Sequence, residues 1–418
     1  MINYALSLIL FIAAIPTNRE VSEKFQNRIS TVSETYGKGQ LEEAIDLGNE
    51  AYEYASDYQY SWGKTKALFI LAFLHSQNEQ YEKALPYYFE VLDTYDGFDT
   101  PESVVDHSKV LFNLGNIMQR HHKFQEALDF YDKGIVFSQK HQLDEMVLDL
   151  LHNKAIACRK GGLYTLALET ITQQRLLIAD MPEKLLENEN QMGLLHKCQE
   201  DYVTAERHFR NILKMEQDHP TARYSGKALG NLGNMRYLNG QMEEAEHFYE
   251  EAIKLAKLES NAGDLFNFHQ SLGLIHGRQN QLDLALQHME QGLEYYDAVE
   301  KSKENIMIHS QLSEVYFLSK NIELGRKHAG LYTEAMVELV RHKENLNNIG
   351  NQYKIDYITT NYYNKIEQRK HLNIFLAVVG LMVFSFLVYL GYQHYRKIQI
   401  ARLIREQLNA VVFDIDDL

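Results

Sequence analysis

Small and apolar side chains return along this chain at a spacing close to forty residues. Within each repeated unit one position is alanine, except in the last unit, where it is glycine. We call the residue at this position the marker of its unit, and the eight markers are Ala44, Ala84, Ala127, Ala167, Ala205, Ala245, Ala285 and Gly325. Each copy has room for two helices of about fourteen to eighteen residues and short turns. The pattern predicts an all-α chain that forms an α-solenoid of about eight helix-turn-helix units.

Two further positions recur with the same spacing of about forty residues. Twelve residues before each marker the side chain is mostly small: Val32, Ala72, Gly115, Ala155, Gly193, Gly233, Gly273 and Ser313. Four residues after each marker it is mostly bulky: Gly48, Tyr88, Tyr131, Ile171, Phe209, Tyr249, Met289 and Ala329. Small residues let two helix backbones approach, and an aromatic ring one turn later fills the space between this pair and the next. Each pair leaves an apolar face open, so the pairs must stack.

The best copies of this pattern resemble the tetratricopeptide repeat. Leu-Gly, a small residue twelve positions on, an aromatic residue and another small residue form that signature. The residues expected to pack the repeats are Leu114, Gly115, Ala127, Tyr131, Gly193, Ala205, Phe209, Leu232, Gly233, Ala245, Tyr249, Ala252, Gly273 and Ala285. The resemblance covers about residues 25–335 and implies a binding scaffold that is not an enzyme.

The chain departs from the family in two ways. The early tryptophan of the signature is replaced, usually by leucine, as at Leu68, Leu111, Leu151 and Leu229. The period of about forty also exceeds the usual length of about 34. The chain therefore resembles the longer-helix variants of the family, which bind peptides.

The resemblance implies that the first helix of each unit lines a concave groove. Side-chain amides recur on that helix and could pair with the backbone of an extended peptide. The candidate peptide-binding residues are Asn113, Asn116, Asn153, Gln191, Asn231, Asn234 and Gln311. Nearby cations that could attract carboxylates are Lys66, Lys109, Arg120 and Lys227. The alternative is that the amides belong to a solvated helix face.

Hydrophobic segments stand near both ends. Residues 1–16 contain a short apolar run that is typical of a secretory signal peptide, although no Lys or Arg precedes it. The alternative is a short apolar helix packed on the first unit. Residues 373–393 contain a long uncharged run, which predicts a transmembrane helix. Basic residues flank it on both sides, and their distribution favours a cytoplasmic C-terminus only slightly.

Two polar segments surround the predicted span. Residues 336–372 are charged and helix-prone, and we expect a helical stalk that could pair with a second copy as a homodimer. Residues 394–418 predict a short amphipathic tail helix. This order is similar to bacterial tetratricopeptide membrane sensors, which continue into a histidine-kinase or DNA-binding module. The short tail leaves no room for either module.

Charge and composition exclude several classes of function. The net charge of −15 disfavours nucleic-acid binding by the bulk of the chain. Cys158 and Cys198 are expected to be free thiols. His75, His196 and His276 recur at one repeat position, which favours packing over metal binding. No catalytic, cofactor-binding or metal-binding motif is present, so we expect no cofactor, no metal and no enzymatic activity.

Three hypotheses remain at this point. The first is a single-pass membrane scaffold or sensor, whose periplasmic array binds a peptide or protein and acts in signalling. The second is a tail-anchored adaptor with the array in the cytoplasm. The third is a truncated relative of a tetratricopeptide histidine kinase or of a membrane-tethered transcriptional regulator.

Overall fold

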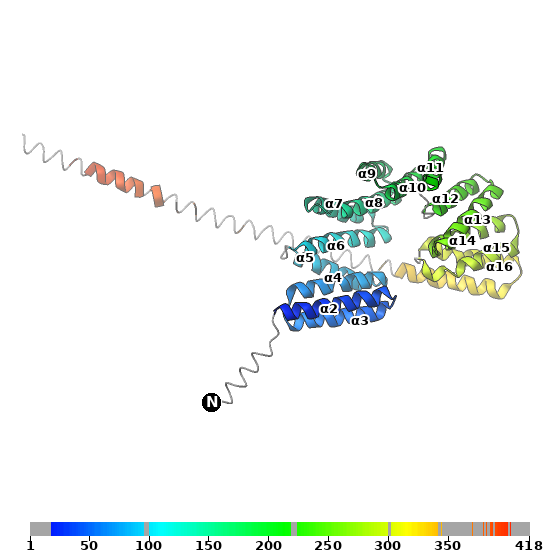
Figure 1. Ribbon diagram of the computed structural model, residues 1–418, viewed down its shortest axis with the longest axis horizontal. Coiled ribbons are helices and arrows are strands. Elements are labelled where there is room, and N and C mark those ends of the chain that lie inside the picture. The colour runs from blue at the N-terminus through cyan, green and yellow to red at the C-terminus, as the bar shows by residue number, and fades with distance from the viewer. Residues whose placement is uncertain are drawn as a thin grey trace, which may run out of the picture. The chain divides into compact units, whose positions relative to one another are not determined.

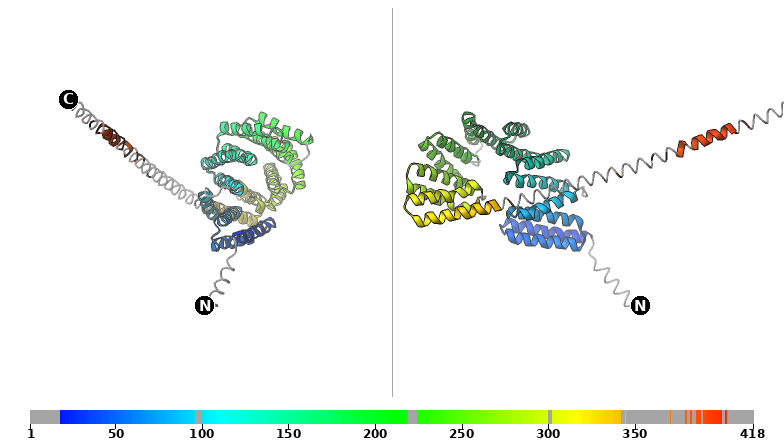
Figure 2. Two further views of the ribbon diagram at one scale, coloured as in Figure 1. Left: turned by 60° about the vertical axis from the view of Figure 1, so that its left-hand side comes forward. Right: turned by 180° about the vertical axis from the view of Figure 1, so that it is seen from behind.

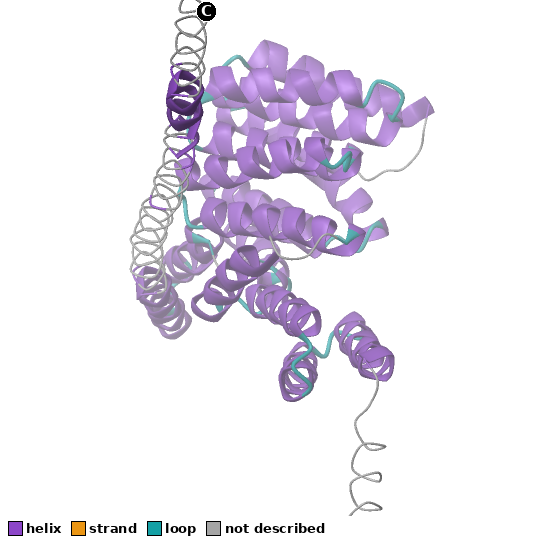
Figure 3. Ribbon diagram, turned by 90° about the vertical axis from the view of Figure 1, so that its left-hand side faces the viewer, coloured by secondary structure: helices purple, strands orange, loops and turns teal. Residues whose placement is uncertain are grey.

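The structure, a computed structural model, describes the four main ranges of the chain and a few residues after them. These are residues 18–95, 100–218, 224–299 and 302–341, with 344, 370, 379, 382, 385–387, 389–399 and 402. Within this part the chain is helical and contains no strand (Figure 3). The all-α prediction is therefore confirmed for the residues that the structure describes.

Helices follow one another in pairs along the described chain (Figure 1). The first helices are α2 (Asn18–Gly37), α4 (Ser61–Gln77), α6 (Pro101–Arg120), α8 (Asp144–Lys160), α10 (Pro182–Cys198), α12 (Ser225–Leu238), α14 (Ala262–Arg278) and α16 (Lys303–Leu318). The second helices are α3 (Leu41–Asp57), α5 (Tyr81–Tyr95), α7 (Phe124–Lys140), α9 (Tyr164–Leu177), α11 (Tyr202–Asp218), α13 (Met242–Leu258), α15 (Leu282–Leu293) and a helix over 322–341. We number these pairs repeat 1 to repeat 8.

The repeats stack in the order of the sequence. Each first helix packs on the second helix of its own repeat, and that second helix packs on the first helix of the next. Some successive first helices also contact one another, as α12 and α14 do. The stack is visible from both sides in Figure 2. This is the solenoid packing predicted from the forty-residue period, and it belongs to a compact unit that ends at Leu346.

Glycines of the first helices face the bulky residues of the second helices. A Cβ atom at Gly115 would lie 2.4 Å from the Tyr131 ring, and one at Gly273 would lie 2.4 Å from Cγ of Met289. The ring thus occupies the space that a side chain would need. The small and bulky columns therefore pack within one repeat, whereas the sequence led us to expect the ring between two repeats.

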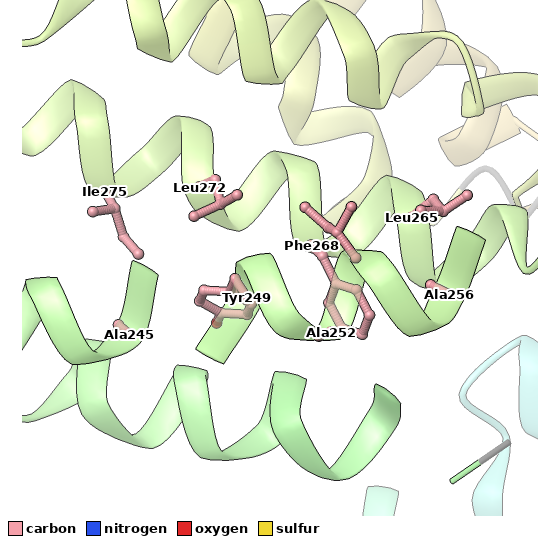
Figure 4. Packing of buried hydrophobic residues seen from close by; sticks show 9 residues of the cluster. Ala245, Tyr249, Ala252, Ala256, Leu265, Phe268, Leu272 and Ile275 are labelled. Carbon is pink, nitrogen blue, oxygen red and sulfur yellow. The ribbon is translucent and has the colours of Figure 1, made fainter. Parts of the chain in front are cut away.

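Repeat 6 shows how the next repeat closes the core (Figure 4). One cluster joins the two facing helices through Ala245, Tyr249, Ala252, Ile253 and Ala256 of α13 and Leu265, Phe268, Leu272 and Ile275 of α14. Burying a large apolar side chain contributes about 1.5–3 kcal/mol. Because four of the nine residues of this cluster come from α14, repeats 6 and 7 share one core.

Tight turns end the helices. After α12, the amide of Gln241 donates to the carbonyl of Arg236 at 2.9 Å, and Gly240 between them has φ of +78°. After α6, Lys123 donates to Met118 at 2.9 Å across His122, whose φ is +58°. A left-handed residue at this position satisfies the last carbonyls of the helix. These turns keep consecutive helices antiparallel and close.

The predicted ends of the chain lie largely outside the described residues. This holds for the segment 1–16, for most of the stalk and the span 373–393, and for most of the tail. Among the described residues, no helix combines the length and apolar character needed to cross a bilayer. The array itself begins earlier than expected, because α2 starts at Asn18 and buries Val21 and Phe25. Its last helix also runs beyond 335.

Candidate functional site

Three first helices, α10, α12 and α14, border a cavity of about 290 Å³. Its lining residues are Asn190, Leu194, Lys197, Lys227, Gly230, Asn231, Asn234, Tyr249, Asp264, Asn267, Phe268 and Ser271. Two of the seven predicted amides, Asn231 and Asn234, are among them. We call this set of residues the α12 cavity.

The other predicted amides lie elsewhere on the array. Asn116 accepts a hydrogen bond from the Tyr131 hydroxyl at 2.8 Å, and Asn153 donates to the carbonyl of Asp149 at 3.1 Å. Gln311 accepts from Gln270 at 3.0 Å. Asn113 is half-buried and Gln191 is buried. Most of these amides already have partners within the array, so the column is not a uniform ladder.

Asn231 orients a lysine. The Lys197 ammonium donates to Oδ1 of Asn231 at 2.9 Å, while Nδ2 of Asn231 donates to the carbonyl of Lys227 at 3.0 Å. Burial lowers the pKa of Lys197. A half-buried ammonium that is bonded to a neutral amide still lacks a compensating negative charge. Lys197 can therefore accept an anionic partner in the cavity.

Lys227 supplies a second cation. Its ammonium lies 5.7 Å from the centre of the Tyr224 ring, within the range of a cation–π contact. Among the residues that the structure describes, no carboxylate lies within ion-pair distance of Lys197 or Lys227. Lys197 on α10 and Lys227 on α12 thus line one cavity without a direct ion pair, and Asp264 is the carboxylate of that cavity on which Lys227 acts at longer range.

The cavity carries one acidic side chain. Burial raises the pKa of Asp264, while the charge of Lys227 acts in the opposite direction. The Asp264 carboxylate accepts a hydrogen bond from Nδ2 of Asn261 at 2.7 Å, at the start of α14. Asn261 caps this helix, since its Oδ1 accepts from the amide of Asp264 at 3.1 Å. Capping thus holds the carboxylate at the end of α14.

One acceptor in the cavity has no partner. Oδ1 of Asn190 is buried and forms no hydrogen bond with the described part of the protein. A buried acceptor without a donor costs about 1–3 kcal/mol.

The remaining wall of the cavity is apolar. A Cβ atom at Gly230 would lie 2.2 Å from Cε1 of Phe268, so glycine lets this ring lie against α12. Leu194 and Tyr249 complete the wall. Burial raises the pKa of the Tyr249 hydroxyl, and the neighbouring Ser271 and Asn234 side chains offset part of that rise. The cavity therefore combines an aromatic surface with hydrogen-bond donors and acceptors.

Of the cations predicted near the groove, only Lys227 lines the cavity. Lys66 is paired with Asp106 at 2.5 Å, Arg120 donates to the Tyr81 hydroxyl at 3.0 Å, and Lys109 is exposed. Reasoning from the sequence missed Lys197. This lysine stands eight residues before its marker, in a column without other lysines.

In the described part of the chain, no group of three His, Cys, Asp or Glu residues could hold a metal ion. Of the three histidines predicted to pack, His196 is half-buried, whereas His75 and His276 are buried. Each of the two buried rings also bonds a glutamine five residues later, Gln80 at 2.9 Å and Gln281 at 2.7 Å. Cys158 and Cys198 are free thiols, as expected.

Comparison with known proteins supports the repeat. Residues 224–298 match the family model of the tetratricopeptide repeat. A tetratricopeptide repeat protein from Parabacteroides merdae is 15% identical with a TM-score of 0.50, over 69% of this chain and 98% of that one. Aspartyl phosphate phosphatase F from Bacillus subtilis is 10% identical with a TM-score of 0.51, over 77% of this chain and 95% of that one. A search of curated proteins found no match. At such identities the two structures support the fold alone.

Proposed function

We propose that this tetratricopeptide repeat protein is an interaction scaffold that binds an acidic peptide segment of a partner protein in the α12 cavity. The observation that carries this proposal is the pair of lysines, Lys197 and Lys227, that line the cavity without a carboxylate within ion-pair distance. An aspartate, a glutamate or a carboxyl terminus of the peptide would supply the missing charge. Hydrogen bonds to a charged group contribute about 1.5–3 kcal/mol each.

A peptide also fits the other groups of the cavity. An apolar side chain of the peptide can lie against Phe268. The chain as a whole has a net charge of −15, which repels an acidic partner at long range. Because the Debye length is about 8 Å at physiological salt, the two nearby lysines dominate once the peptide has reached the cavity.

A peptide library tests this proposal. The full chain in detergent would be immobilised and exposed to hexapeptides that carry Asp or Glu at two positions. A second library with Asn or Gln at those positions is the matched neutral probe. We expect about tenfold or greater retention of the acidic library, in line with the loss of one charged hydrogen bond. Equal retention of both libraries would overturn the proposal.

Membrane anchoring is the second part of the proposed function. The uncharged segment 373–393 has the length of a transmembrane helix, and the apolar run in 1–16 suits a signal peptide. We propose that the array is held outside the cytoplasm by this span, and that peptide binding is passed to the tail as a signal. Reporter fusions after Gly226 and Leu418 test the topology. A cytoplasmic Gly226 reporter would favour the tail-anchored adaptor instead.

A further inference from the structure

Pairs of side chains nineteen residues apart recur in the array, and their chemistry changes along it. One member precedes the marker of its repeat by sixteen residues, and the other follows the marker by three. In four repeats the first member is leucine: Leu68 with Tyr87, Leu111 with Phe130, Leu151 with Thr170, and Leu229 with Phe248. In three repeats both members are ionisable: Glu189 with His208, His269 with His288, and His309 with His328. The last two repeats thus carry a histidine pair each.

Both histidine pairs are in direct contact. Nδ1 of His269 lies 3.2 Å from Nδ1 of His288, and Nδ1 of His309 lies 3.1 Å from Nδ1 of His328. His269, His309 and His328 are 4%, 6% and 7% exposed. A contact between two ring nitrogens is a hydrogen bond only when one nitrogen carries a proton and the other does not. If both nitrogens were protonated, two N–H groups and two positive charges would face each other.

The surroundings of the first pair give it little compensation. The His276 ring stacks on His288 at 5.3 Å, and its Nε2 lies 3.9 Å from a carboxylate oxygen of Glu246 on α13. Burial, the neighbouring His288 and Lys257 together lower the pKa of His269 to about 4. Burial and His276 also lower the pKa of His288, while Glu250 opposes this change.

The second pair lies among aromatic rings. The Tyr296 ring meets His309 edge-on at 4.9 Å, and the Tyr316 ring stacks on His328 at 5.5 Å. The Tyr316 hydroxyl donates to the carboxylate of Glu290 on α15. Burial and then Lys327 lower the pKa of His328, and Glu290 acts in the opposite direction. Here too the neutral form of the imidazole is favoured.

We propose that the two histidine pairs form an acid-sensitive end of the array, at which repeats 7 and 8 open in mildly acidic solution while α12 and the helices before it stay closed. In the unfolded chain each histidine takes up a proton near pH 6.5. In the folded chain the pKa values of His269, His288 and His328 are lowered, so the unfolded state binds more protons below that pH. Stability is therefore complete above pH 6.5 and is lost as the pH falls towards the folded pKa of about 4 for His269.

Repeat 5 shows why the histidine pairs differ from an ion pair. His208 lies 2.7 Å from the carboxylate of Glu189, which also bonds Arg175 at 2.6 Å. Burial alone would raise the pKa of Glu189, but the bonds from His208 and Arg175 lower it to about 2. The Glu189 carboxylate therefore stays ionised in mildly acidic solution and can accept an N–H from His208, whereas two protonated imidazoles in a pair of repeat 7 or 8 would repel each other.

Hydrogen exchange of the full chain at pH 7.5 and pH 5.0, corrected for intrinsic rates, tests the proposal. From the pKa of His269, the opening equilibrium of α14 should rise by about thirtyfold at pH 5. The amides of α12 should change much less. The variant His269→Leu with His288→Phe carries the residues of repeat 6, and it should lose the acid response of α14 and α15. A response that persists in this variant would overturn the proposal.

A second variant guards against a folding defect. Leu229→His with Phe248→His places a histidine pair in repeat 6, and it should make α12 and α13 acid-sensitive while they remain protected at pH 7.5. The matched control is His122→Asn, which removes an exposed histidine from a left-handed position that asparagine tolerates. It should leave the acid response unchanged. An acid response that disappears in this control would count against the two pairs as its source.

Discussion

Lys66 and Lys227 occupy the same position of two repeats, eighteen residues before their markers, and they meet opposite surroundings. The Lys66 ammonium on α4 lies 2.5 Å from Asp106 and 3.0 Å from Glu102 on α6. The position equivalent to Asp106 in the later pair is Asp264 on α14. There the carboxylate bonds Asn261 instead, and Lys227 faces a cavity.

The difference shows that the same repeat position can hold either a lysine in an ion pair, as at Lys66, or a lysine that lines a cavity, as at Lys227. At Lys66 an ion pair joins two first helices, and the side chains of Lys66 and Asp106 are 13% and 4% exposed. At Lys227 the capping asparagine of α14 competes for the carboxylate. The column of lysines alone therefore does not identify a binding site, because the partner on the next repeat decides whether the charge is available.

The largest effect is expected at Asp106, which forms the ion pair with Lys66. Asp106→Ala would leave the Lys66 ammonium buried with only the half-exposed Glu102 nearby. Breaking a buried ion pair in this way costs about 3–5 kcal/mol. Urea denaturation of the full chain would measure the change in unfolding free energy. A loss of less than about 1 kcal/mol would mean that the pair resembles a surface ion pair.

The next largest effect is expected at Gly230, in the wall of the α12 cavity. Gly230→Ala places a methyl group 2.2 Å from the Phe268 ring, which must move. Overpacking of this kind costs about 1–3 kcal/mol. Urea denaturation would measure the loss, and binding of an acidic peptide should weaken with it. Gly277→Ala on α14 is the matched control, because nothing lies within 4 Å of the added atom.

A smaller effect of opposite sign is expected at Asp264. Because burial raises its pKa, the folded state binds more protons than the unfolded state just above pH 3.8, and the ionised side chain reduces stability at pH 7. Asp264→Asn should therefore stabilise the chain slightly at pH 7, with no gain at pH 3. Thermal unfolding at the two pH values would reveal the difference. A clear destabilisation at pH 7 would contradict the contrast with Asp106.

The smallest effect concerns salt. Increasing the ionic strength from about 0.15 M to 1 M shortens the Debye length from about 8 Å to about 3 Å. Affinity for an acidic peptide should fall only several-fold, since Lys197 is half-buried and screened less than a surface charge. A loss of binding as large as that caused by removing both lysines would indicate attraction to the surface instead of a seated ligand.

The sequence predicted the stacked helix pairs because small and bulky residues recur at a fixed spacing. It did not predict their contacts correctly, since Gly115 lies against Tyr131 and Gly273 against Met289 within one repeat. Several residues that line the α12 cavity could not be predicted in this way, because they do not recur at the repeat spacing. Lys197 and Asn190 line it from α10, and the position of Asp264 depends on the cap formed by Asn261.

Ion pairing was equally hidden in the sequence. Lys66 and Lys227 stand in one column, and only the structure shows that Asp106 neutralises the first of them. The histidine pairs went unnoticed because their members lie on different helices, nineteen residues apart. His269 and His288 meet only when α14 and α15 pack.

The affinity of the acidic hexapeptide that is best retained from the library tests the central claim most directly. Titration calorimetry would compare the full chain with Lys227→Met and with the matched variant Lys66→Met, and would repeat each titration with the neutral isostere of the peptide. We expect Lys227→Met to weaken binding of the acidic peptide by about tenfold or more, to the level of the isostere, and Lys66→Met to leave the affinity of the folded chain unchanged. Equal losses in both variants, or none in Lys227→Met, would contradict the claim that the α12 cavity binds a carboxylate.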